Sequence, residues 1–353
     1  MVLVLALFAL LWGVGHIMGA PKTARFYMIG LLYLAVVALH LALPDGHPLR
    51  LATGESPALW LLLGGFVALI LAYRALLSRL RNRVETTEQQ EKSTGPQPLF
   101  SETELNRYAR HMILREVGGP GQKRLKQARV LVIGAGGLGA PVLQYLAAAG
   151  VGTIGVIDDD VVENTNLQRQ VIHRDASIGM PKVFSAQQEM QNQNPFVTVQ
   201  PYNRRLTQEI AADLFAEYDL VLDGTDNFDT RYLVNETAVV LGLPLVSGAL
   251  SQWEGQLSVF DPARGAPCYR CVFDTAPAPE LAPSCAEAGV IGPLPGVVGS
   301  MMAMEAIKVL TGAGAPLLGQ LAIYDGLYGE SRTIAITRRA SCPTCGNLEA
   351  KAS

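Results

Sequence analysis

The chain has 353 residues, of which 49% are hydrophobic, 17% charged and 7% aromatic. Soluble domains carry about 25% charged residues, so this composition excludes a wholly soluble protein as well as a disordered or nucleic-acid-coating one. The formal charge of −3 is unevenly divided. Residues 1–83 hold seven Lys/Arg and two Asp/Glu, whereas residues 84–353 hold 21 Lys/Arg and 29 Asp/Glu. At ~150 residues per domain, the length and this asymmetry predict two different units.

The first 83 residues are predicted to be a membrane anchor. Three apolar runs, at about 2–19, 26–43 and 58–77, approach the ~20 residues that a helix needs to cross a bilayer. Most basic residues flank one end of these runs: Lys22, Arg25, Arg79, Arg81 and Arg83. The positive-inside rule then predicts a multi-pass protein of the inner (cytoplasmic) membrane, with its N-terminus outside and the rest in the cytoplasm. A cleaved signal peptide is the alternative for the first run, which begins without Lys or Arg.

The remaining chain is predicted to be a polar linker followed by an α/β domain. Residues 84–100 are mostly polar and have no apolar period, which indicates a flexible linker. A helix is expected over 102–115, and strands over 129–133, 153–157 and 220–223 alternate with helical segments. Buried strands of this kind favour a mostly parallel sheet covered on both faces.

A glycine motif follows the first of these strands. Gly134, Gly136 and Gly139 fit G-x-G-x-x-G, and Asp158 lies 19 residues after the last glycine. Such glycines bring the backbone close to a phosphate at a helix N-terminus, and the acid can hold a ribose hydroxyl. Alone, the motif predicts nucleotide binding, and an NAD enzyme is the first interpretation to test.

The next charged residues differ from those of a dehydrogenase. Arg169 and Lys182 are fixed cations of the kind that a triphosphate requires. Pro181 suits the first turn of a helix, which places Lys182 at the positive end of a helix facing the nucleotide. Asp226 follows a predicted strand, where a carboxylate can hold Mg²⁺. Each residue singly is compatible with a solvated surface charge, but their order favours a site for ATP.

Five cysteines provide a further pattern. Cys268 and Cys271 form one C-x-x-C pair, and Cys342 and Cys345 form a second, with 70 residues between the pairs. In a cytoplasmic domain, two such pairs predict a closed structural zinc site, with redox disulfides as the alternative. Cys285 stands alone in a Pro/Ala-rich stretch, where it is either a nucleophile or a bystander thiol.

Seven motifs follow one another along the chain: NRYARH (106–111), GAGGLG (134–139), NLQRQ (166–170), GMPK (179–182), DGTDN (223–227), CYRC (268–271) and CPTC (342–345). Together they resemble the ThiF/HesA/MoeB superfamily, relatives of the ubiquitin-activating enzymes. Within it, the sequence is most similar to the molybdopterin-synthase adenylyltransferase type, over residues 101–346, with 347–353 as a tail. The resemblance implies a Rossmann-like fold with a mixed sheet and structural zinc. It also implies ATP-dependent adenylation of the C-terminal glycine of a ubiquitin-like sulfur carrier ending in Gly-Gly, with release of pyrophosphate.

The resemblance also implies roles for individual residues. Nucleotide contacts are expected from Gly137, Asp158, Thr165, Asn166, Leu167, Gln168, Arg169, Lys182, Asp226 and Asn227. Of these, Arg169 and Lys182 would hold the triphosphate and Asp226 would hold Mg²⁺. Arg110 is expected to reach into the partner's site of a homodimer, and Cys285 matches a loop cysteine that some members use covalently.

Departures from the family pattern are few. His111 stands where Gln is expected, and Gly224 where Cys is common. The anchor is unusual, and no sulfurtransferase domain follows the second cysteine pair, so a separate sulfur donor is expected. Three interpretations remain: a carrier adenylyltransferase acting on the molybdopterin or the thiamine carrier, a membrane-anchored binding protein of the same fold, and an NAD oxidoreductase.

Overall fold

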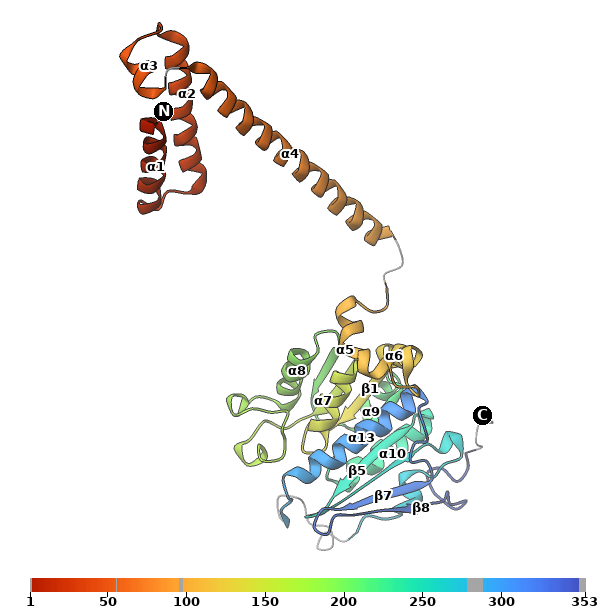
Figure 1. Cartoon of the computed structure of the whole chain (residues 1–353). Helices are drawn as coiled ribbons and strands as arrows, with labels where there is room; N and C mark the ends of the chain where they lie inside the picture. Colours follow the sequence, from red (N-terminus) through yellow and green to blue (C-terminus); the bar gives the residue numbers. More distant parts are fainter. Residues whose placement is uncertain (1, 55, 95–97, 278–287, 349–353) are drawn as a thin grey trace. The chain divides into compact units, whose positions relative to one another are not determined.

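The chain divides into two compact units, Met1–Pro98 and Leu99–Ser353. The computed structural model describes residues 2–54, 56–94, 98–277 and 288–348, and Figure 1 follows them in sequence colours. Each unit has its own core.

The first unit consists of helices. They are α1 (Val2–Ile17), α2 (Lys22–Ala42), the short α3 (Pro48–Thr53) and α4 (Pro57–Thr94). Its small core is formed by Val4, Val36 and Trp60, from three different helices. The Trp60 indole donates to the Thr53 carbonyl at 3.2 Å, and the Tyr33 hydroxyl donates to the Trp60 carbonyl at 2.6 Å. These contacts join α2, α3 and α4 at one end of the unit.

Two segments of the first unit are long and apolar enough to cross a membrane. They are Lys22–Ala42 and Pro57–Arg79. The helix in the first predicted span, α1, has 16 residues and is shorter than the ~20 that a spanning helix needs. A third segment that meets both criteria, Pro293–Thr311, belongs to the second unit, where half of it is buried. Its apolar residues therefore serve a protein core.

Helix α4 differs from the sequence prediction at its C-terminal end. The segment 84–94 was expected to be flexible linker, but α4 continues through it to Thr94. Neither Gly nor Pro occurs between Phe66 and Thr94, and the segment is rich in Glu and Gln, which favour helices. Gly95 and Pro96 follow directly in the sequence, so the helix ends where residues that disfavour helices begin.

The second unit is built on one eight-stranded sheet. Its strands are β1 (Arg129–Ile133), β2 (Thr153–Asp158), β3 (Thr198–Asn203), β4 (Leu220–Asp223), β5 (Leu245–Leu250), β6 (Glu254–Phe260), β7 (Gln320–Asp325) and β8 (Glu330–Ala335). They lie in the order β3-β2-β1-β4-β5-β6-β7-β8. The first five strands in this order pair in parallel, and β6, β7 and β8 continue the sheet antiparallel. The expected mixed sheet is therefore present.

Helices cover both faces of the parallel part. They are α5 (Glu102–Met112), α6 (Gly118–Gln127), α7 (Gly139–Ala149), α8 (Lys182–Gln193), α9 (Gln208–Phe215), α10 (Phe228–Leu241), α11 (Tyr269–Val272) and α13 (Pro293–Thr311). Within β1, Val130 and Val132 join the core with α7, α8 and α13, whereas Leu131 and Ile133 join the core with α9 and α10. Successive strand side chains point to opposite faces, so this apolar strand fills both cores.

Candidate active site

A cavity of about 840 Å³ lies at the carboxyl ends of the parallel strands. Its walls include residues that follow β1, β2, β4 and β5. The strand order reverses between β1 and β4, because β2 and β3 lie on one side of β1 and β4 and β5 on the other. Open α/β sheets bind ligands at this kind of switch point, and the volume suits a nucleotide-sized ligand.

The glycine motif forms the turn between β1 and α7 at the edge of this cavity. Gly134 has φ +93°, a conformation that other residues rarely adopt. A Cβ at Gly139 would lie 2.0 Å from the Gly134 carbonyl oxygen, so the close turn requires glycine there as well. Gly136 and Gly137 line the cavity. The amino end of α7 therefore faces the cavity, as a phosphate site requires.

Asp158, at the end of β2, is tied to this turn. Its Oδ2 accepts a hydrogen bond from the Ala135 amide at 2.7 Å, and its Oδ1 accepts one from the Asp160 amide at 2.8 Å. Burial raises the pKa of this carboxyl, against the opposing charge of Lys182. A carboxylate has about four acceptor positions, so Asp158 keeps acceptor capacity toward the cavity that it lines.

The two predicted cations line the same cavity. Lys182 is the first residue of α8, its side chain is buried, and its Nζ contacts Asp160 Oδ2 at 2.6 Å. Arg169 donates to the Thr165 carbonyl and to Asn166 Oδ1, each at 3.2 Å. Both cations are thus held in defined positions, and Asp160 is the counter-ion of Lys182.

Asp226 and Asn227 line the cavity from the turn between β4 and α10. The Asn227 side chain accepts from the Thr230 amide at 2.8 Å and so caps α10. Asp223 is buried at the end of β4, and its Oδ1 accepts from the Thr225 amide at 3.0 Å and hydroxyl at 2.7 Å. The Asp226 side chain is exposed to the cavity, so its carboxylate is available to a cation.

Other predicted site residues lie elsewhere. Among the residues that the structure describes, Thr165, Asn166, Leu167 and Gln168 are not part of the cavity wall, although Asn166 contacts Arg169. Arg110 is exposed on α5, also away from the wall. The neighbouring Tyr108 packs on Gly150, at the opposite edge of the sheet where β2 begins. Cys285 lies outside the described residues.

Several residues of the cavity wall were not among the predicted site residues. They include Gln170, Arg205 and Arg231. Gln170 is buried and its Oε1 has no hydrogen-bond partner within the described chain. Arg231 lies four residues after Asn227, a spacing that places both on one face of a helix. The sequence therefore contains a signal that Arg231 lies near the predicted site. Nothing in the local sequence marks Arg205.

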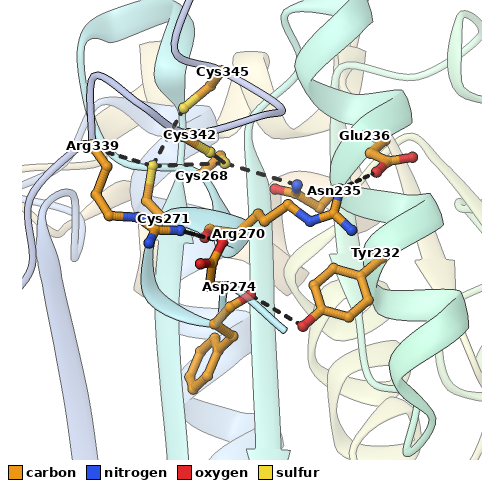
Figure 2. Close-up of polar contacts among 11 residues, drawn as sticks. Tyr232, Asn235, Glu236, Cys268, Arg270, Cys271, Asp274, Arg339, Cys342 and Cys345 are labelled. Atoms are coloured by element: carbon orange, nitrogen blue, oxygen red, sulfur yellow. Dashed lines mark hydrogen bonds and ion pairs between the residues drawn. The ribbon is translucent and has the colours of Figure 1, made fainter. Parts of the chain in front are cut away.

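The four paired cysteines converge in a second, closed site. Cys268 and Cys342 have sulfurs 3.6 Å apart, and Cys271 and Cys345 have sulfurs 3.4 Å apart (Figure 2). All four are buried free thiols, with ligand atoms within 4.8 Å of one another. A tetrahedral zinc ion with ~2.3 Å bonds places its sulfurs about 3.8 Å apart. The four cysteines therefore fit a zinc ion. The structure contains them as free thiols and not as the alternative disulfide pairs.

Polar contacts surround the cysteine cluster. The Asn235 amide lies 3.9 Å from Cys268 Sγ, and the Arg339 backbone amide donates to Cys271 Sγ at 3.5 Å (Figure 2). Arg339 also pairs with Asp274 at 2.7 Å. Donors directed at sulfur stabilise thiolates and orient metal ligands, so the surroundings suit a metal ion as well as the sulfurs do.

Comparison with known proteins agrees with this geometry. The model of the ThiF family matches residues 108–344. A sulfur carrier protein adenylyltransferase from Thermus thermophilus is 53% identical over 252 residues, which are 70% of this chain and 93% of that protein. A probable adenylyltransferase/sulfurtransferase MoeZ from Mycobacterium tuberculosis is 53% identical over 256 residues, 72% of this chain and 65% of that one. The adenylyltransferase and sulfurtransferase MOCS3 of Bos taurus is 45% identical over 278 residues, 61% of its length.

Solved structures share the fold. The structure of Escherichia coli MccB with ATP superposes with a TM-score of 0.60 at 24% identity, covering 70% of this chain and 76% of that one. The structure of PaaA superposes with a TM-score of 0.60 at 22% identity, covering 86% of this chain and 90% of that one. At these identities the likeness concerns the fold alone.

Proposed function

The chain belongs to the ThiF family, and on that premise we propose that it is a nucleotidyltransferase that adenylates the C-terminal glycine of a ubiquitin-like sulfur carrier. The Thermus relative, which this chain covers almost completely, is named for that activity. The mixed sheet, the glycine turn and the cavity at the switch point are all consistent with it.

The reaction requires alignment more than acid–base chemistry. A carboxylate oxygen of the carrier's terminal glycine attacks the α-phosphorus of ATP, the bond from that phosphorus to the bridging oxygen breaks, and pyrophosphate leaves. The carboxylate is already a nucleophile, so no protein base is needed. What the protein must supply is orientation and positive charge where negative charge develops.

The observation that supports this function best is the pair of cations in the cavity wall. Arg169 and Lys182 line the cavity together with the glycine turn. Two fixed cations suit a triphosphate. Lys182 would exchange Asp160 for a phosphate oxygen when ATP binds. Asp226 would hold Mg²⁺, which neutralises phosphate charge, and Asp158 would accept from a ribose hydroxyl.

Among carriers we propose the small subunit of molybdopterin synthase, in molybdenum cofactor biosynthesis, on the resemblance of the combined motifs. The test is ATP–pyrophosphate exchange by the full-length protein in detergent, with purified molybdopterin and thiamine carriers compared. Exchange is expected with the first and not with either carrier shortened by its Gly-Gly end. Failure of every native carrier to stimulate exchange would contradict the proposed activity, and stimulation by the thiamine carrier alone would change only the partner.

We propose that the cysteine cluster holds one structural zinc ion. Its four ligands would be Cys268, Cys271, Cys342 and Cys345, whose spacing and burial fit a tetrahedral ion. The ion would join the segment after β6 to the end of the chain, because the pairs are far apart in sequence. It lines no part of the cavity, and we assign it no step of the reaction.

We propose that residues 1–83 hold the enzyme on the inner membrane with its catalytic unit in the cytoplasm. The large side chains Leu62 and Leu69 are 70% and 67% exposed on α4, where lipid would cover them. Lys22 and Arg25 lie in the first turn of α2, and Arg79 ends the apolar segment Pro57–Arg79 of α4; the proposed orientation places both positions on the cytoplasmic side. Protease digestion of right-side-out and inverted vesicles distinguishes this orientation from its reverse.

We further propose that Arg110 acts across a homodimer, since it lies away from its own cavity. The test mixes Arg110→Ala subunits with Lys182→Ala subunits under conditions that exchange partners. A mixed dimer holds one cavity with both residues, so random pairing restores about a quarter of the wild-type exchange. If mixing restores nothing while each variant still dimerises, the trans role is wrong.

A further inference from the structure

Helix α10 connects the nucleotide cavity with the cysteine cluster. Along it, Asn227, Arg231, Asn235 and Val239 recur at intervals of four and share one face. Asn227 caps the helix at the cavity, Arg231 lines the cavity, and Asn235 and Val239 lie against the cysteine cluster. At ~1.5 Å per residue, this face spans about 18 Å. One rigid element therefore touches both sites.

Arg231 is the most densely bonded residue of this face. Its side chain is buried, its Nη1 donates to Ser247 Oγ at 3.1 Å, and its Nη2 donates to the Gly248 carbonyl at 2.8 Å. Nη1 lies 3.6 Å from Asp223 Oδ2. Nη2 also donates to the Thr225 carbonyl. One guanidinium thus joins β5 and the end of β4 to the turn that precedes Asp226.

The middle of α10 is bonded to the segment between the first two cysteines. Asn235 is buried, and its Oδ1 accepts from the Tyr269 amide at 2.9 Å. Its amide nitrogen lies against Cys268 (Figure 2). The Tyr269 ring lines a small internal cavity together with Arg231 and Ser247. Arg231 is therefore enclosed on its inner side by the sheet and on its outer side by Tyr269.

We propose that Arg231 is a positioning residue for the nucleotide site: through the Thr225 carbonyl it fixes the turn that presents Asp226 to the metal of the bound nucleotide, with Asn235 holding α10 in register. This inference rests on the proposed role of Asp226. It assigns Arg231 no contact with the reacting atoms. The carbonyl of Thr225 is one residue from Asp226, so a shift of this turn moves the Asp226 carboxylate directly.

The geometry of the guanidinium is essential to this role. Arginine presents five donors in a planar fork, whereas lysine presents a compact charge on a flexible stem. Lysine at position 231 would keep a positive charge near Asp223 but would not bond Thr225, Ser247 and Gly248 together. Arg231→Lys thus separates positioning from charge, which Arg231→Ala would not, because it would leave buried Asp223 without its partner.

The test measures the affinity of the full-length protein for α,β-methylene-ATP with Mg²⁺ and with EDTA. In the wild type, Mg²⁺ is expected to tighten binding. Because small displacements of a fixed group are costly, Arg231→Lys is expected to reduce this Mg²⁺ advantage about tenfold, with the affinity in EDTA changed less than about twofold. Ser247→Ala and Asn235→Ala should reduce it by about twofold to threefold. The matched control is Arg129→Lys at the opposite edge of the sheet, where Arg129 pairs with Glu217.

The outcomes separate this inference from the proposed function. If Arg231→Lys binds as the wild type does, or loses affinity equally with Mg²⁺ and EDTA, Arg231 does not position Asp226. If that variant fails to fold, Ser247→Ala decides, and an unchanged Mg²⁺ advantage overturns the inference. A full Mg²⁺ advantage in Asp226→Asn overturns the metal role of Asp226 and this inference with it. None of these measurements uses a carrier, so pyrophosphate exchange tests the activity independently.

Discussion

Large apolar side chains occupy opposite positions in the two units of this chain. In Met1–Pro98, leucines such as Leu62 and Leu69 are exposed on long helices, and the core consists of a few residues. In Leu99–Ser353, leucines such as Leu143 and Leu146 are fully buried between the sheet and its helices. The second unit buries its apolar residues between its own sheet and helices, and the first leaves many of them exposed, as the proposed membrane anchor would.

The difference extends to polar groups. The second unit places its buried charges in pairs, such as Arg231 with Asp223 and Lys126 with Glu104, around a defined cavity or a helix end. In the first unit, several of the described polar contacts, such as His40 with Thr53 and Arg50 with Asp45, involve α3. Helix α2 and the segment Pro57–Arg79 of α4 are mostly apolar. Chemistry is thus expected from one unit and location from the other.

The strongest test of this division is Lys182→Ala. Exchange is expected to fall by about 10²–10³-fold, the usual loss when one fixed positive group is removed from a developing anion. Membrane association and thermal unfolding should remain near wild type, because the change removes a contact only with exposed Asp160. Pyrophosphate exchange and vesicle flotation measure the two properties. The matched control is Lys123→Ala, at an exposed position of α6. If the activity of Lys182→Ala lies within threefold of this control, the assigned role of Lys182 is contradicted.

The next prediction concerns the contribution of the cysteine cluster to the stability of the second unit. Cys345→Ser is expected to reduce bound zinc from one ion per chain to nearly none, and to destabilise the second unit by more than about 4 kcal/mol, as loss of a structural metal does. Elemental analysis and denaturant unfolding measure both changes. Full zinc content in this variant, or zinc absent from the wild type, would show that the cluster is not the proposed metal site.

A smaller effect is expected at the start of α5. Glu104 accepts from the Ser101 amide at 3.0 Å and pairs with Lys126. Burial opposes ionisation, but the bonds from Lys126 and Ser101 lower the pKa of Glu104. A lowered native pKa stabilises the fold above the unfolded-state pKa of ~4.3 and ceases to do so as the pH falls through the native value.

We therefore expect Glu104→Gln to lower the free energy of unfolding by about 1.5–3 kcal/mol at pH 7, the value of hydrogen bonds to a charged group. The difference from wild type should shrink in denaturant unfolding at pH 4 and below. Glu102→Gln, exposed on the same turn, is the control. A difference that grows on acidification would mean that the native pKa is not lowered.

The smallest effect on chemistry is expected from removing the first unit. A fragment of residues 99–353 should remain soluble without detergent and retain exchange within about twofold, because it corresponds to nearly the whole Thermus relative and has its own core. Size-exclusion chromatography and the exchange assay measure this. An inactive but folded fragment would show that residues 1–98 contribute to catalysis, and the division into chemistry and location would be wrong.

Much of the fold was predictable because it depends on local patterns. The predicted strands at 129–133 and 220–223 match β1 and β4, and the third, 153–157, matches β2 to within one residue. The cation pair, Asp226 and the four cysteines were recognisable because their chemistry limits which residues can serve. Polarity alone predicts a linker over 84–94, and the absence of Gly and Pro is the sequence feature that favours the helix found there.

Other features depend on contacts between distant segments. Lys182 pairs with Asp160, which lies 22 residues earlier in the chain, just after β2. Arg231 binds the backbone carbonyls of Thr225 and Gly248, groups that any sequence provides. Arg205 enters the cavity only because β3 lies beside β2. No local pattern encodes such a meeting, because backbone acceptors are the same at every residue.

By itself, the sequence determined two units of different character, a nucleotide turn, and which side chains have the chemistry for a triphosphate and for zinc. Periodicity and residue chemistry are local properties, so they can be recognised without coordinates. Only the tertiary structure decided that Arg110 lies away from its own cavity, that Asp160 holds Lys182, and that Arg231 connects the Asp226 turn to the sheet. These depend on the order of strands and on the path of α10, which set distances between residues far apart in the chain.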